Sequence, residues 1–132
     1  MNNLKDLPKV ELHSHLDCSL SFDAVQQLNP TVTREEYREK YVAPSKCRSL
    51  DHYLQCTLAS VKLLQTREAL EIAVADLFKQ LMTDNVIYTE IRFAPLLHKE
   101  KGLTPEKIVE VVETACTRYS KETDIESRII LC

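Results

Sequence analysis

The order of strand-forming and helix-forming segments is the feature that most limits the folds open to this chain. Alternating apolar and polar residues predict a strand at 9–15, and β-branched and aromatic residues predict a second strand at residues 86–93. A third strand is predicted for the last residues, 128–132. Strands separated by helices pair in parallel and build an α/β fold. Three such strands leave two open edges and one bare face, so we expect the first three strands of a (β/α)8 barrel.

Apolar residues at helical spacing predict helices between these strands. A short helix at residues 21–28 ends at Asn29-Pro30, and Thr33 with Glu36 has the capping-box spacing that opens a second short helix. Thr104 and Pro105 provide an N-cap and a first-turn proline for the helix before the third strand. The apolar residues that recur at helical spacing in the two longer helices before the second strand are Leu50, Leu54, Leu58 and Val61, and Leu70, Ala73, Val74, Leu77, Phe78 and Leu81. In the helix before the third strand, the expected buried stripe is Ile108, Val111, Val112 and Ala115. We treat residues 1–132 as the N-terminal portion of one barrel domain.

Composition excludes several classes of protein. Gly102 is the only glycine, so glycine-rich phosphate-binding loops are excluded. The formal net charge of −3 does not indicate the basic surface that nucleic-acid-binding proteins carry. No apolar run reaches the ~20 residues that cross a bilayer, and residues 1–11 lack an apolar stretch of signal-peptide type. The five cysteines are odd in number and never form C-x-x-C. We therefore expect a reducing, cytoplasmic location, with no membrane partner.

His13-Ser14-His15, at the end of the first predicted strand, is the clearest chemical signal. Side chains alternate along a strand, so both imidazoles are expected on one face, with attachment points roughly 6.6 Å apart. Two imidazoles at that spacing can converge on one metal ion, and zinc and neighbouring transition metals suit such ligands. The end of a barrel strand is also where α/β barrels keep their active sites. The alternative is a pair of surface histidines near a turn.

The segment PKVELHSHLDCSL resembles the opening motif of the adenosine deaminase family, in which the first strand ends in His-x-His-Leu-Asp-Gly. The likeness continues in order along the chain. Ser49 to Leu54 resembles the start of the family's lid-like helix, VIYTEIRFAPLLH its second strand and loop, GLTPEKIVEVV the next helix, and RIILC the third strand.

This resemblance implies roles for particular residues. His13 and His15 would be zinc ligands, with His15 also lining the substrate site, and Asp17 would accept a hydrogen bond from a sugar hydroxyl of a nucleoside. Tyr53, with Leu50 and Leu54, would form part of the apolar wall over the base. The alternatives are that Asp17 caps the short helix that follows it and that the residues of the wall are ordinary helix packing.

The family reaction is the hydrolytic deamination of adenosine or 2′-deoxyadenosine to inosine or its deoxy form and ammonia, in which zinc activates water for attack on C6 of the purine. The resemblance places the remaining metal ligands and the proton-donating glutamate on later strands, beyond Cys132, and a full barrel needs ~250 residues. Three alternatives stay open: an amidohydrolase acting on a related purine (adenine, a nucleotide or a modified nucleoside), one acting on a cyclic amide, and a non-catalytic metal-binding fragment. The oligomeric state also stays open.

Other residues carry smaller expectations. Cys18 stands where the family has glycine, so the loop must follow a path that a side chain tolerates or carry modest strain; a catalytic thiol is not expected there. Arg92 is expected to pair with Glu11 or Glu90 beneath the metal, because buried charges need partners. His52 and His98 lack ligand spacing and are expected at the surface.

Overall fold

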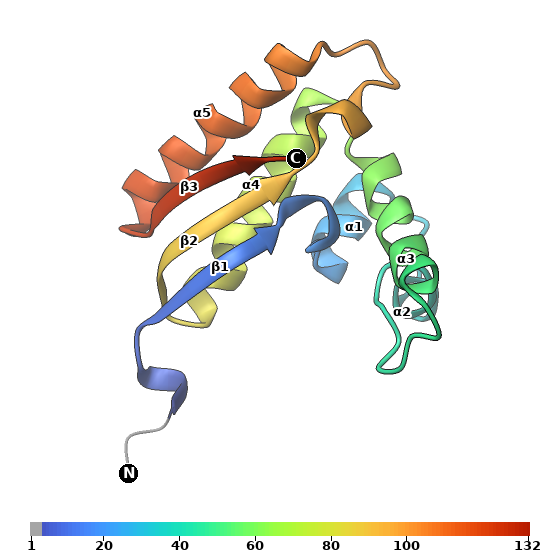
Figure 1. The fold of residues 1–132 in the computed structure, drawn as a ribbon, viewed down its shortest axis with the longest axis horizontal. Helices are drawn as coiled ribbons and strands as arrows, with labels where there is room; N and C mark the ends of the chain where they lie inside the picture. The colour runs from blue at the N-terminus through green and yellow to red at the C-terminus, as the bar shows by residue number, and fades with distance from the viewer. Residues whose placement is uncertain (1–3) are drawn as a thin grey trace.

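Three parallel strands form the sheet in the computed structural model, which describes residues 4–132. The strands are β1 (Lys9–His15), β2 (Val86–Phe93) and β3 (Glu126–Leu131), and they lie side by side in chain order (Figure 1). The first two predicted strands are confirmed. β3 begins earlier than predicted because Glu126 and Ser127 pair with Tyr88 and Thr89 of β2. The first three residues of the N-terminal segment lie outside the described part of the chain.

Five α-helices connect and cover the strands. They are α1 (Phe22–Leu28), α2 (Arg34–Lys40), α3 (Leu50–Leu63), α4 (Arg67–Thr83) and α5 (Pro105–Thr123). Each begins at a serine or threonine whose hydroxyl accepts a hydrogen bond from a first-turn backbone N–H, as N-caps do: Ser21, Thr33, Ser49, Thr66 and Thr104. Short 3-10 turns follow β1 (Leu16–Cys18) and β2 (Pro95–His98), and a third precedes β1 (Leu4–Asp6).

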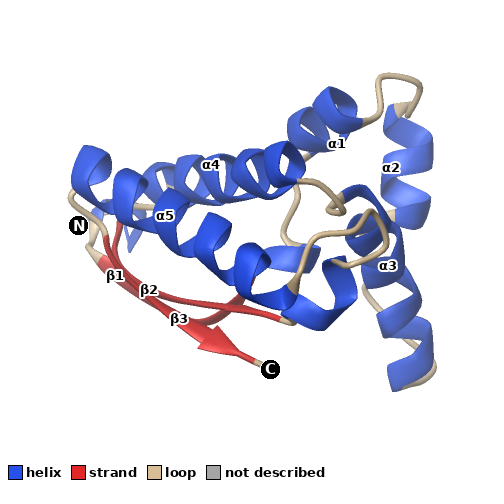
Figure 2. Cartoon of the chain, turned by 90° about the horizontal axis from the view of Figure 1, so that it is seen from above, coloured by secondary structure: helices blue, strands red, loops and turns tan. Residues whose placement is uncertain are grey.

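The hydrophobic core lies between the sheet and helices α4 and α5, which cover one face of the sheet (Figure 2). Phe78 of α4, Ile91 and Phe93 of β2 and Ile108 of α5 are enclosed there. On β1, by contrast, Val10 and Leu12 remain 56% and 58% exposed. The described residues therefore form half of a layered α/β structure with one bare face, as the sequence predicts.

Helix α3 has the predicted apolar spacing, but most of its apolar face is exposed. Leu50 and Leu58 are 71% and 54% exposed, and only Ser60 and Val61 near the C-terminal end are buried. The reason is visible in Figure 1, where α3 projects away from the sheet beside α2 and reaches the core only at its end. Apart from Val61, the apolar stripe of α3 is therefore largely uncovered by the described part of the chain.

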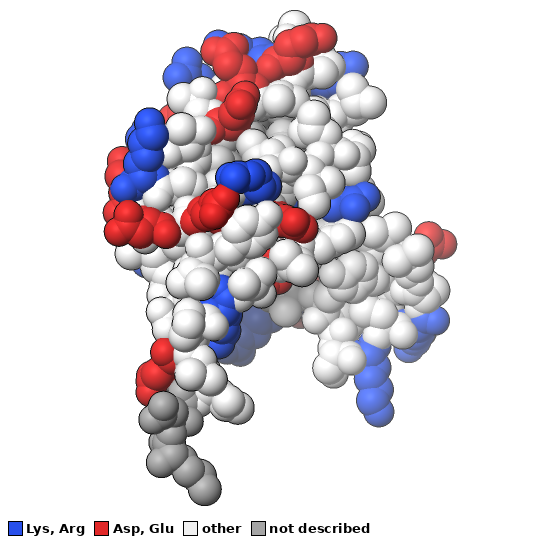
Figure 3. Space-filling model, turned by 60° about the vertical axis from the view of Figure 1, so that its left-hand side comes forward, with Lys and Arg blue, Asp and Glu red and all other residues white. Residues whose placement is uncertain are grey.

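The surface carries charges of both signs. On the face shown in Figure 3, acidic and basic side chains of the described residues intermix over the upper part of the molecule and form no extended patch of one sign. In the described part of the chain, no helix combines the length and apolar character needed to span a bilayer.

Candidate metal and substrate site

The carboxyl end of β1 carries both histidines, but the strand there is not regular. Glu11 pairs with Thr89 and Ser14 with Ile91, so β1 has one more residue than β2 between these pairs and forms a bulge. Within the bulge His13 adopts φ 64°, a left-handed conformation that histidine tolerates better than bulky residues do. Simple alternation is therefore wrong as a description of this strand. The two imidazole rings nevertheless lie 5.0 Å apart, centroid to centroid, with their planes tilted by 41°.

This spacing fits two ligands of one metal ion. Imidazoles that bind a tetrahedral ion at ~2.0–2.1 Å place their ring centroids roughly 5 Å apart, close to the separation of His13 and His15. Both rings are accessible, since His13 is exposed and the His15 side chain is 41% exposed. Nδ1 of His15 faces Oδ1 of Asp17 at 3.8 Å, which leaves Nε2 for an ion. A carboxylate on the far nitrogen of a metal-binding histidine is a common way to orient the ring.

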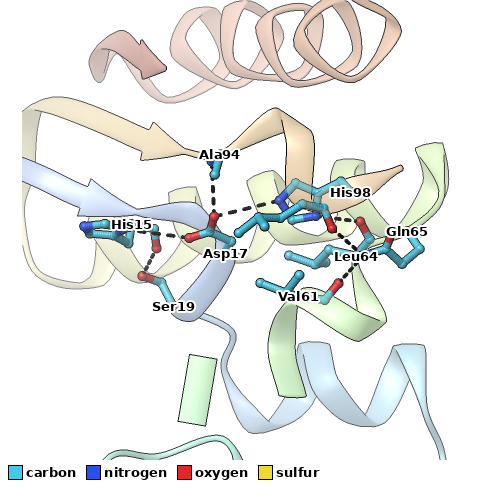
Figure 4. A network of polar contacts seen from close by, with 9 residues as sticks. His15, Asp17, Ser19, Val61, Leu64, Gln65, Ala94 and His98 are labelled. Atoms are coloured by element: carbon cyan, nitrogen blue, oxygen red, sulfur yellow. Dashed lines mark hydrogen bonds and ion pairs between the residues drawn. The ribbon is translucent and has the colours of Figure 1, made fainter. Parts of the chain in front are cut away.

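Asp17 lies in the 3-10 turn that follows β1, and it is buried. Oδ2 accepts a hydrogen bond of 3.3 Å from the backbone N–H of Ala94, and Nε2 of His98 lies 3.8 Å from the same oxygen (Figure 4). Burial by itself would raise the pKa of Asp17, but the contacts with His98 and Ala94 and the nearby charges of His98 and His15 outweigh it, so the net pKa is lowered. A carboxylate is therefore held at the end of β1, beside the histidine pair.

The cap interpretation of Asp17 is wrong. Helix α1 begins after Ser21, whose hydroxyl accepts from the Ala24 N–H at 3.3 Å, so the cap is supplied four residues further along the chain. Ser21 is itself fixed by Asp76 of α4, which accepts hydrogen bonds from its N–H and its hydroxyl at 2.8 and 2.5 Å. The Asp17 side chain is directed instead toward the loop after β2.

His98 is not a surface residue, contrary to the sequence-based expectation. Its side chain is fully enclosed, and Nδ1 lies 2.8 Å from the carbonyl oxygen of Leu64 (Figure 4). His52 is partly buried, and its Nδ1 accepts a hydrogen bond from the Arg48 N–H at 3.3 Å, at the start of α3. Sequence spacing does not reveal the burial of His98 because all its polar neighbours come from distant parts of the chain.

Gln65 is a second buried polar residue that sequence reasoning missed. Its side-chain nitrogen donates to the carbonyl oxygens of Val61 and Leu97 at 2.7 and 2.9 Å, and its oxygen accepts from the Glu100 N–H at 2.9 Å. These bonds tie the loop after β2 to the junction of α3 and α4. A lone glutamine between two helices gives no sign of this role in the sequence.

The loop at Cys18 accommodates a side chain without left-handed strain. Among residues 4–132, the non-glycine residues with positive φ are His13, Asn85 and Asp124, so Cys18 has an ordinary backbone conformation. Burial raises the pKa of the Cys18 thiol to about 11, and the negative charge of Asp17 acts in the same direction. The thiol is therefore protonated near neutral pH, which argues against a nucleophilic cysteine. His15, Asp17 and Cys18 nevertheless offer ligand atoms within 4.8 Å of one another.

Tyr53 comes close to this loop. It is partly exposed on α3, and together with Cys18 and Cys56 it lines a small cavity of about 30 Å³. Helix α3 therefore borders the turn after β1, at the same end of the sheet as the histidine pair. Leu50 and Leu54, the other expected wall residues, are exposed.

The expected ion pair of Arg92 is wrong for the described part of the chain. No salt bridge joins Arg92 to Glu11 or Glu90 within residues 4–132, and the buried Nε of Arg92 has no hydrogen-bond partner there. Glu90 instead accepts a hydrogen bond of 3.3 Å from the Tyr88 hydroxyl. Arg92 is paired in the sheet with His15, so it lies at the same end of the strands as the candidate site.

Comparison with known proteins decides the family. The family model described as adenosine deaminase matches residues 8–132. The chain belongs to the adenosine deaminase family. Relatives named adenosine deaminase from Clostridium botulinum and Clostridium perfringens are 41% and 40% identical to it, and each match covers 98% of this chain. The chain spans only 41% of the length of these relatives.

Solved structures confirm the barrel-type fold of this family member. An amidohydrolase from Burkholderia ambifaria with bound zinc matches 97% of the chain with a TM-score of 0.77 and 22% identity, over 36% of its own length. Adenine deaminase from Arthrobacter aurescens matches 92% of the chain with a TM-score of 0.76 and 23% identity, over 38% of its length. An Arabidopsis N6-mAMP deaminase matches 99% with a TM-score of 0.76 and 21% identity, over 42% of its length. At these identities the likeness establishes the fold alone.

Proposed function

We propose that this chain is the N-terminal portion of the barrel of a zinc-dependent deaminase that hydrolyses adenosine or 2′-deoxyadenosine to the inosine form and ammonia. Two findings support the activity: membership of the adenosine deaminase family and relatives of that name at about 40% identity. The observation that carries the proposal is the pair of imidazole rings, 5.0 Å apart, beside a buried carboxylate at the carboxyl end of β1. Active sites of α/β barrels lie at that end of the strands.

His13 and His15 would hold the metal ion through one ring nitrogen each. Zinc is proposed because two imidazoles at this separation suit it and because one neighbour in fold was solved with zinc. A bound zinc ion would activate water for attack on C6 of the purine. The Asp17 carboxylate, 3.8 Å from Nδ1 of His15, would help to orient that ring, and His15 would also border the space that the substrate occupies. Two protein ligands make a weak zinc site, so the remaining ligands and the proton donor are expected from residues outside this chain.

Asp17 and Tyr53 would contact the nucleoside. A carboxylate with a lowered pKa is ionised near neutral pH and accepts hydrogen bonds, which suits a sugar hydroxyl. Tyr53 would contribute an aromatic surface to the wall over the base, since it borders the same loop from α3. The partner is therefore a small purine nucleoside, and a reducing cytoplasm remains the expected compartment.

The main alternatives differ in which purine is the substrate. Neighbours in fold carry the names adenine deaminase and N6-mAMP deaminase, and other solved neighbours are complexes with IMP and GMP. Parallel assays with adenosine, 2′-deoxyadenosine, adenine, AMP and N6-methyl-AMP would rank these substrates. A non-catalytic metal-binding protein would bind zinc and form no deaminated product from any of them.

The deciding experiment replaces His13 or His15 by alanine in the full-length protein, with His52→Ala as the matched control. Zinc content and inosine formation should both fall in the first two variants and stay at the level of the unmodified protein in the control. Undiminished zinc and turnover in either His13→Ala or His15→Ala would reject the ligand assignment.

A further inference from the structure

His98 lies between Asp17, in the turn after β1, and the C-terminal end of helix α3. It ends the 3-10 turn after β2, and its side chain is 0% exposed. Nδ1 lies 2.8 Å from the carbonyl oxygen of Leu64, the C-cap residue that follows α3. Because a carbonyl oxygen only accepts hydrogen bonds, Nδ1 carries a hydrogen and the ring orientation is fixed from this side.

The other ring nitrogen points at Asp17. Nε2 lies 3.8 Å from Oδ2, and it has no hydrogen-bond partner within residues 4–132. That separation exceeds a normal hydrogen bond by roughly 1 Å or less. A neutral ring with its hydrogen on Nδ1 has only a lone pair at Nε2, so the bond to Asp17 requires the imidazolium form, in which both nitrogens donate; a small movement of either side chain would then form a charge-assisted bond. A buried nitrogen without any other partner favours that movement, because an unsatisfied polar atom is costly in the protein interior.

The loop that carries His98 is held firmly in place. Gln65 donates to Leu97 and accepts from Glu100 on the two sides of His98, and the Ala94 N–H donates to Asp17. The loop therefore cannot easily withdraw the imidazole from Asp17. Oδ2 of Asp17 faces both Ala94 and His98, and this arrangement leaves Oδ1 on the side of His15 (Figure 4).

We propose that His98 is a positioning residue for nucleoside binding, which fixes the Asp17 carboxylate against the end of helix α3 so that Oδ1 faces the sugar. The proposal rests on the proposed function, because it takes Asp17 as the contact to the sugar hydroxyl. It adds a residue outside the histidine pair and a physical link between that carboxylate and α3, the helix that carries Tyr53. Loss of the link should weaken recognition of the sugar and leave the chemistry at the purine ring largely intact.

Two substitutions separate the two ring nitrogens of His98. The amide of asparagine falls near the position of Nδ1, and the longer glutamine places its amide near Nε2. His98→Asn therefore retains the bond to Leu64 and loses the approach to Asp17, whereas His98→Gln retains a donor toward Asp17 and loses the bond to Leu64. Both variants lose part of the buried imidazole, so both are expected to unfold at lower urea concentration.

The measurements are KM and kcat for adenosine and for adenine in the full-length protein, together with urea unfolding. H98N should raise KM for adenosine about tenfold with little change in kcat, and KM for adenine should change much less. H98Q should restore most of the lost affinity although it is also destabilised. In an Asp17→Ala background H98N should have no further effect on KM, because coupled residues are not additive.

Other results would overturn the proposal. Each of three results would assign His98 a merely structural role: equal changes in KM for adenosine and adenine in H98N, a KM change that follows the loss of stability in both variants, or full additivity of H98N with Asp17→Ala. The proposed function fails separately, if the unmodified protein does not deaminate adenosine or if Asp17→Ala leaves adenosine KM unchanged. If neither variant folds, ring-nitrogen NMR of the unmodified protein decides: the proposal requires hydrogens on both Nδ1 and Nε2 of His98 and a shift of its Nε2 signal when inosine binds, but not when hypoxanthine binds. A neutral ring with its hydrogen on Nδ1 alone would overturn the proposal.

Discussion

Substitution of Asp17 by alanine tests the structural and the ligand-binding roles of this carboxylate together. The side chain is buried, it accepts a hydrogen bond from Ala94, and it faces Nε2 of His98 and Nδ1 of His15. Asp17→Ala in the full-length protein is therefore expected to lower the free energy of unfolding and to raise KM for adenosine.

The loss of stability follows from the groups left without a partner. The Ala94 N–H loses its acceptor at 3.3 Å, and the enclosed Nε2 of His98 loses the carboxylate oxygen that lies 3.8 Å from it. A hydrogen bond to a charged group contributes about 1.5–3 kcal/mol, and the 3.3 Å contact is long, so about 1.5 kcal/mol is expected for Ala94. With a smaller contribution from His98, the unfolding free energy should fall by about 2–3 kcal/mol.

The loss of binding is a separate quantity. A sugar hydroxyl that loses its acceptor in a closed site costs about 1–3 kcal/mol, which corresponds to roughly 5–150-fold in KM for adenosine. Adenine has no sugar, so its KM should change by less than about threefold if the site stays intact.

Asp17→Asn is the matched control, because asparagine keeps the size and one acceptor oxygen. Its stability should lie between those of the unmodified protein and Asp17→Ala, as measured by urea unfolding followed by circular dichroism. Ammonia release with adenosine and with adenine gives the two values of KM. An equal rise for both substrates would show that Asp17 only supports the loop, and an unchanged stability of Asp17→Ala would refute the contacts described for its side chain.

Three further predictions concern other parts of the chain. Gln65→Leu removes three hydrogen bonds from a buried site and should lower the unfolding free energy by about 3–5 kcal/mol in urea titrations, whereas Gln55→Leu, on the exposed part of α3, should change it by less than about 0.5 kcal/mol. Similar values for the two would contradict the role of Gln65 in tying the loop after β2 to the junction of α3 and α4. Burial raises the pKa of the Cys116 thiol to about 12. At pH 8, iodoacetamide should therefore label the exposed Cys47 and spare Cys116 until urea unfolds the protein, as followed by mass spectrometry, and equal labelling rates would be inconsistent with this burial. The 132-residue chain expressed alone should form no inosine, and it should self-associate in size-exclusion chromatography because β1 and β3 are open edges and Val10 and Leu12 are exposed. A monomer that deaminates adenosine would refute both points.

Local sequence signals predicted most of the fold. The bounds of β1 and β2 and the N-caps at Thr33 and Thr104 agree with the structure, because hydrophobic periodicity and cap chemistry act over a few residues. The apolar spacing of α3 was predicted, but its large exposure was not readable from it, because periodicity reports which residues share a face and not whether anything covers that face.

The chemical identity of the candidate site was also readable from the sequence. His13, His15 and Asp17 follow one another within a few residues, and their order resembles the family motif. The geometry was not readable in the same way. The bulge that turns His13 to φ 64° depends on how β1 pairs with β2, and pairing register is set by contacts between strands far apart in sequence.

Only the tertiary structure gave roles to His98 and Gln65. Leu64, Gln65 and His98 meet because the crossover from α3 through α4 to β2 brings segments more than 30 residues apart into contact, as their hydrogen bonds show. Lone polar residues at such separations carry no period and no motif. Their burial depends on the packing of whole elements. The sequence by itself therefore predicted candidate ligands for a metal and a sugar, and only the fold showed that His98 lies beside Asp17 and that Gln65 ties the neighbouring loop to the junction of α3 and α4.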